Sequence, residues 1–166
     1  YNLGNAYKNG HGVPHDYSAA FKWYERAAEQ EHALAKFNLG ILREFGFGVA
    51  KDLELAMKWY KLAAELGEIE AYIKLGDKYY LGKHVPQDFP AAFKWFSLAA
   101  EQGDTLSKNA LIIMYLEGQG VEKDYDEAAK LTKEVEATKW NKKATSGEGK
   151  SAEDMPEVAL GEFLEA

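Results

Sequence analysis

The chain has 166 residues, of which 46% are hydrophobic and 13% aromatic, which is enough for one domain with an apolar core. Its formal net charge of −7 argues against nucleic acid or an anionic membrane surface as a partner, since both favour a basic face. There is no cysteine, so disulfides, thiolate metal sites and cysteine nucleophiles are excluded, and no apolar run is long enough to predict membrane insertion.

The sequence repeats with a period of 36 residues from its beginning. Leucine, glycine, valine, aspartate, alanine and tryptophan recur in one register. The aligned sets are Leu3, Leu39, Leu75 and Leu111; Gly10, Gly46, Gly82 and Gly118; Val13, Val49, Val85 and Val121; Asp16, Asp52, Asp88 and Asp124; Ala20, Ala56, Ala92 and Ala128; and Trp23, Trp59 and Trp95. This spacing predicts about three and a half copies of one unit. The expected boundaries are near residues 1–32, 33–68, 69–104 and 105–138.

Each unit is predicted to form two helices, as the second unit illustrates. Residues 33–45 have apolar side chains at i, i+4 and i+7, a helical spacing, and Gly46 is suited to a left-handed cap at the helix end. Asp52 stands where the N-cap of a second helix is expected, over residues 53–66. Small residues in both helices predict close packing, and we expect tryptophans such as Trp59 to fill the wedge between them.

The last part of the chain departs from the repeat. In the fourth unit Ile112 replaces the recurring glycine and Leu131 replaces the tryptophan, which is typical of a terminal repeat. Residues 139–166 break the period and are predicted to be a polar linker followed by a segment at 152–166. That segment is either a disordered acidic end or a short amphipathic helix. Because the chain begins without methionine, inside a repeat, we expect it to be a piece of a longer protein.

Residues 71–103 follow the pattern A-x-x-x-L-G-x-x-Y-x-x-G-x-G-V-x-x-D-x-x-x-A-x-x-W-Y-x-x-A-A-x-x-G, except that His84 replaces the second loop glycine and Phe96 the tyrosine. This pattern resembles that of the Sel1-like repeat family, relatives of the tetratricopeptide repeat, and the resemblance covers residues 1 to about 138. It implies an all-α fold, a right-handed α/α superhelical solenoid, that serves as an adaptor or scaffold for other proteins. Many relatives are bacterial and linked to the envelope, and the sequence fits a periplasmic, exported or cytoplasmic location.

In such a solenoid the first helix of each unit lines the concave side. Besides its core stripe, the helix at 33–45 carries a second apolar line at Leu34, Phe37, Ile41 and Phe45. This line either packs against the neighbouring first helix or forms an apolar groove, with isolated polar anchors, that binds a helix or an extended peptide. The predicted protein-binding residues are Asn5, Leu34, Phe37, Ile41, Ile73, Asp77, Tyr80, Asn109, Ile113 and Leu116. Those expected to be exposed are Phe37, Ile41, Ile73, Tyr80 and Ile113.

The sequence indicates no catalytic, metal or cofactor site. Asp16 has an equivalent in every unit, as a structural cap does, whereas catalytic groups in a repeat protein are asymmetric. His11 and His15 share a loop with Asp16 but have no matching second set of ligands, so we expect a solvated loop. The predicted function is therefore a protein-binding scaffold. The alternative is an array whose groove is filled by segment 152–166 of its own or a neighbouring copy, and an enzyme is a distant third.

Overall fold

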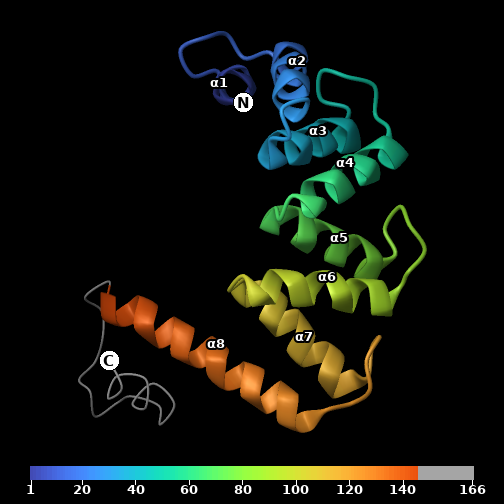
Figure 1. The fold of residues 1–166 in the computed structure, drawn as a ribbon, viewed down its shortest axis with the longest axis vertical. Coiled ribbons are helices and arrows are strands. Elements are labelled where there is room, and N and C mark those ends of the chain that lie inside the picture. Colours follow the sequence, from blue (N-terminus) through green and yellow to red (C-terminus); the bar gives the residue numbers. More distant parts are fainter. Residues whose placement is uncertain (146–166) are drawn as a thin grey trace.

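A computed structural model describes residues 1–145, which form a stack of four helical hairpins (Figure 1). The helices are α1 (Asn2–Asn9), α2 (Tyr17–Ala28), α3 (Ala33–Phe45), α4 (Leu53–Glu65), α5 (Ile69–Leu81), α6 (Phe89–Glu101), α7 (Thr105–Glu117) and α8 (Tyr125–Thr145). The hairpins follow one another along the longest axis, with α1 and α2 at one end and α7 and α8 at the other (Figure 1). Within residues 1–145 there is no strand, and the prediction of an all-α solenoid is confirmed.

The helix ends are built as the repeat predicts. Asp52 accepts a hydrogen bond from the backbone N–H of Leu55 at 2.9 Å, and Asp16, Asp88 and Asp124 cap α2, α6 and α8 in the same way. Each first helix ends at a glycine in the left-handed region, where a side chain would be strained. These glycines are Gly10, Gly46, Gly82 and Gly118.

Within a hairpin, the two helices meet where a glycine faces an aromatic ring. A Cβ atom on Gly40 would lie 2.5 Å from the ring of Tyr60, which is fully buried, and Gly76 lies equally close to Phe96. The residue that faces the glycine is thus the one after the tryptophan, while Trp59 and Trp95 pack against the buried core. Trp59 is half-buried instead, because neighbouring residues of a helix point about 100° apart and only one of the two aromatic residues can face the glycine.

Successive units are locked together at the loop between their helices. Gly48, with φ of 68°, lies against the start of α2, so that a Cβ there would be 2.5 Å from the carbonyl carbon of Tyr17. The Ser18 hydroxyl also donates a hydrogen bond of 2.7 Å to the Gly48 carbonyl oxygen. Gly120 makes the same close approach to Phe89 and the nitrogen of Pro90. The second loop glycine thus serves the junction with the preceding unit.

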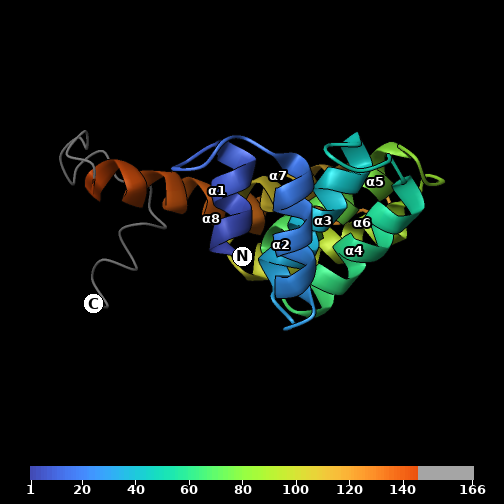
Figure 2. The same ribbon diagram turned by 90° about the horizontal axis from the view of Figure 1, so that it is seen from above.

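The array ends differently from the prediction. The turn that follows α4 at Gly67 has no counterpart after α8, which continues to Thr145 and extends past the other hairpins (Figure 2). The first residues of the predicted linker are therefore helical. Segment 152–166, predicted as an acidic end or an amphipathic helix, lies outside the described residues. None of the described helices is both long and apolar enough to span a membrane.

Candidate functional site

The predicted apolar line on the first helices is largely covered. Phe37 and Ile41 of α3 and Ile73 of α5 are half-buried and pack against the core shared by the second and third units. The Phe37 ring lies 5.6 Å from that of Tyr60. The expectation that these three residues are exposed is wrong, because side chains of α3 and α5 fill the space between consecutive units. Leu34 is half-buried as well.

The line reaches solvent at Phe45, at the end of α3, and in the fourth unit. Ile113 and Leu116 of α7 are both exposed, as is Leu106, about two turns closer to the start of the helix than Ile113. Asn109 lies between them and is half-buried. The exposure expected for Ile113 is therefore confirmed, and α7 offers an apolar face of its own.

Two of the predicted polar residues are engaged within the chain. Asn5 accepts a hydrogen bond of 2.6 Å from the hydroxyl of Tyr24, and the hydroxyl of Tyr80, half-buried rather than exposed, donates one of 3.0 Å to Gln119. Asp77, by contrast, reaches solvent. Crowding by surrounding protein raises the pKa of Asp77, although nearby lysines such as Lys74 favour its charged form.

A buried ionic cluster, which the repeat pattern does not predict, joins the second and third units. Glu44 of α3 is buried and accepts a hydrogen bond of 2.6 Å from the hydroxyl of Tyr60. It also forms a short ion pair with Lys78 of α5, itself buried. Lys74 Nζ lies 3.6 Å from the same carboxylate. We call Glu44, Tyr60, Lys74 and Lys78 the ionic cluster.

The ionic cluster keeps Glu44 charged. Burial alone would raise the pKa of Glu44, but the hydrogen bonds from Lys78 and Tyr60 and the charges of Lys74 and Lys78 outweigh it and hold the pKa below its usual value. Burial, and then the bond to Glu44, raise the pKa of Tyr60. The sequence does contain a signal for the ionic cluster. The positions aligned with Lys78 include Leu42 and Met114, so a lysine at this position departs from the repeat.

Next to the ionic cluster, three aromatic rings form a stack at the loop end of α3. The Tyr17 and Phe47 rings lie 4.8 Å apart and the Phe45 and Phe47 rings 5.5 Å apart, both nearly parallel. Phe45 exposes 52% of its surface and Phe47 40%. Lys74 Nζ lies 5.7 Å from the Phe45 ring centroid, which ties the stack to the ionic cluster. We call Tyr17, Phe45 and Phe47 the aromatic edge.

The aromatic edge belongs to one junction alone. The residues aligned with Phe47 are His11, Lys83 and Gln119, all polar. The fold therefore does not need an aromatic ring at this position. Sequence reasoning placed Phe45 on the apolar line but passed over Phe47, because it follows the helix, where a search for helical spacing ends.

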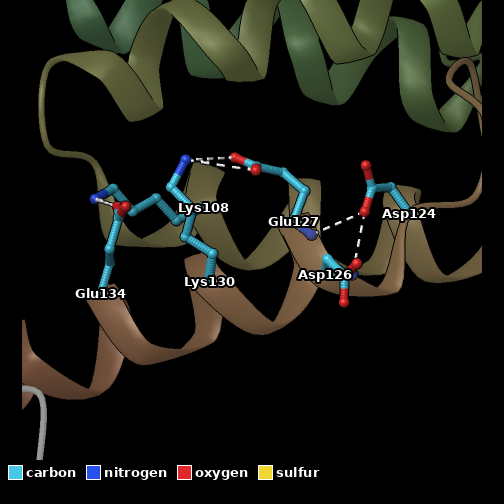
Figure 3. Close-up of polar contacts among 6 residues, drawn as sticks. All are labelled: Lys108, Asp124, Asp126, Glu127, Lys130 and Glu134. Atoms are coloured by element: carbon cyan, nitrogen blue, oxygen red, sulfur yellow. Dashed lines mark hydrogen bonds and ion pairs between the residues drawn. The ribbon is translucent and has the colours of Figure 1, made fainter.

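Hollows also recur between consecutive second helices, on the other side of the hairpins. Those between α2 and α4, α4 and α6, and α6 and α8 measure about 660, 360 and 350 Å³. Figure 3 shows the charges at the third: Lys108 pairs with Glu134 at 2.6 Å and Lys130 with Glu127 at 3.1 Å, while Asp124 caps α8. Because these lysines are paired with carboxylates of α8, this hollow is better explained as part of the helix packing than as a ligand site.

Comparison with protein families matches the Sel1 repeat over residues 1–32, 33–68, 69–104 and 110–134. The chain belongs to the Sel1 repeat family. A solved structure of a Sel1 repeat protein from Oxalobacter formigenes is similar with 31% identity and a TM-score of 0.75, over 99% of this chain and 70% of that one. No curated protein matches.

A second similar structure is a protective antigen present in uropathogenic Escherichia coli strains, which displays an SLR fold. Its identity is 41% and its TM-score 0.70, over 89% of this chain; the chain spans 30% of that protein. Sel1 repeat proteins are generally protein-interaction scaffolds and not enzymes. In the described residues no group of three or more His, Asp or Glu side chains is placed to hold a metal ion.

Proposed function

We propose that this Sel1 repeat protein binds a helical or extended apolar segment of a partner protein on its first-helix surface, with the aromatic edge as the main contact. The observation that carries the proposal is the exposure of Phe45 and Phe47 in one stack. Single exposed apolar residues are ordinary, but stacked exposed rings at a position that the repeat fills with polar residues call for a partner.

The surroundings of the aromatic edge suit binding without rearrangement. The ionic cluster and the helix junction hold Phe45 and Tyr17, so little side-chain freedom is lost when a partner covers the rings. Aromatic residues are also enriched among the residues that dominate binding energy at interfaces. The apolar face of α7, with Ile113 and Leu116, offers a second exposed apolar contact on a first helix.

Replacing Phe45 and Phe47 with alanine is expected to weaken binding of the partner about tenfold or more, because truncation of a central aromatic contact typically costs that much. Affinity capture from the producing cells, followed by titration of the recovered protein, measures the change. Leu66→Ala is the matched control, since Leu66 of the α4 end is 41% exposed and lies away from the edge. Unchanged binding by the phenylalanine variants, or an equal loss for Leu66→Ala, contradicts the proposal.

A further inference from the structure

The aromatic edge lies beside a surplus of positive charge, although the chain as a whole has a formal net charge of −7. The ionic cluster contains two lysines and one carboxylate, which leaves it with a net charge of +1. Its carboxylate is already held by Lys78 and Tyr60, so Lys74, at 3.6 Å, is the most loosely bound partner. The side chain of Lys74 is 27% exposed and lies over the ring of Phe45.

Two further cations lie on the loop side of the aromatic edge. Lys51 is exposed and packs on Gly46, between the two phenylalanines, so that its Cβ lies 3.2 Å from where a Cβ of Gly46 would be. Arg43 donates a hydrogen bond of 3.2 Å to the carbonyl oxygen of Ala50 in the same loop. In the part of the chain that the structure describes, neither side chain forms an ion pair.

The carboxylates of this region have positive neighbours of their own. Asp16 and Asp52 cap α2 and α4, whose N-terminal ends are positive through the helix dipole. Asp77 of α5 has Lys74 and Lys83 among the cations that favour its charged form. Within residues 1–145, these carboxylates therefore leave the cations at the aromatic edge in excess.

The stack itself offers ring edges more than ring faces. Phe47 stacks on both Tyr17 and Phe45, with interplanar angles of 12° and 19°. Lys74 lies over Phe45, and the His15 ring meets that of Tyr17 at 84°. A lysine or arginine of a partner needs a free ring face for a cation–π contact, whereas ring edges carry positive partial charge and attract oxygen atoms. The rings and the cations therefore favour the same kind of partner.

We propose that the segment bound at the aromatic edge is acidic. An apolar or aromatic side chain of the partner covers Phe45 and Phe47, and neighbouring carboxylates pair with Lys51 and Lys74. In a partner helix, side chains three or four residues apart are separated by roughly 5–6 Å, which matches the 5.7 Å between Lys74 Nζ and the Phe45 ring centroid. This inference rests on the proposed function, because it names the class of partner for the same site.

A display library of random dodecapeptides tests the proposal on the full chain. Peptides that bind the wild type are counter-selected on a double variant, Phe45→Ser with Phe47→Ser, so that those that need the aromatic edge remain. We expect them to combine an aromatic or large aliphatic residue with Asp or Glu three or four residues away. Retained peptides that are neutral or basic overturn the acidic partner but leave the proposed binding site standing. If no peptide depends on the two phenylalanines, the proposed site fails, and this inference fails with it.

A pair of charge reversals then tests the cations with one selected peptide, labelled for fluorescence anisotropy. Lys51→Glu should weaken its binding about threefold to tenfold, since an exposed ion pair becomes a repulsion. Lys58→Glu, on the exposed side of α4, changes the net charge of the chain equally and is the matched control. Added salt should weaken binding to the wild type more than binding to Lys51→Glu. Equal effects of the two reversals, or no effect of Lys51→Glu, overturn the pairing of the partner's carboxylates with the edge.

Discussion

Replacing Gly48 with alanine is expected to lower the free energy of unfolding by about 3 kcal/mol. Two costs add: an L-residue in the left-handed region costs roughly 1–2 kcal/mol, and overpacking a filled site costs roughly 1–3 kcal/mol. The atoms that a Cβ would meet are backbone atoms of Tyr17 and Ser18, which can move only if the start of α2 moves. Urea unfolding monitored by circular dichroism measures the loss.

Gly12 provides the matched control. It has nearly the same φ, 74°, but open space around the Cβ position, so Gly12→Ala is expected to cost only the backbone term of roughly 1–2 kcal/mol. His84 occupies the same loop position with φ of 70°, which shows that a residue with a side chain can adopt this backbone conformation. If Gly12→Ala and Gly48→Ala lower the free energy of unfolding equally, measured on dilute protein, then the contact between units is not the reason that position 48 needs glycine.

Removing the carboxylate of the ionic cluster is expected to cost about 3 kcal/mol or more at neutral pH. Glu44→Ala leaves the buried Lys78 without its ion-pair partner and the Tyr60 hydroxyl without its acceptor, and breaking a buried pair typically costs roughly 3–5 kcal/mol. The double variant Glu44→Leu, Lys78→Met should lose less than Glu44→Ala. Each substitution introduces an apolar residue that the fourth unit has at the aligned position, Leu116 for Glu44 and Met114 for Lys78.

The same cluster predicts a dependence of stability on pH. Because folding lowers the pKa of Glu44, its contribution is present above the unfolded pKa of about 4.3 and is lost as the pH falls through the lower folded value. The wild type should therefore lose stability below that pH more steeply than Glu44→Gln. If the free energy of unfolding falls equally steeply with pH for the two proteins across this acidic range, then the lysines do not hold Glu44 in its charged form.

The repeat predicted the parts of the fold that recur and missed those that occur once. Asp52 caps α4 and Gly46 ends α3 as expected, since each depends on neighbouring residues in the chain. The contact of Tyr60 with Gly40 was not predicted, because Trp59 and Tyr60 both lie on the apolar side of a helix and spacing alone does not fix its rotation.

The candidate site was harder to predict than the fold. Exposure of Phe37 and Ile41 depends on how closely consecutive first helices approach, a distance that the repeat pattern does not contain. The pair of Glu44 and Lys78 spans 34 residues and appears at one junction, so aligning the units hides it. The aromatic edge combines residues of a loop and two helices, and only their arrangement in space brings them into one stack.

Site-specific photo-crosslinking in the producing cells tests the binding surface most directly. A benzophenone amino acid at position 47 keeps an aromatic ring in the stack, and the same probe at position 66 reports an equally exposed apolar site outside it. We predict that position 47 crosslinks a distinct partner protein, that position 66 does not, and that Phe45→Glu abolishes the crosslink. The same partner captured equally from both positions, or from position 66 alone, would contradict the assignment of the aromatic edge as the binding site.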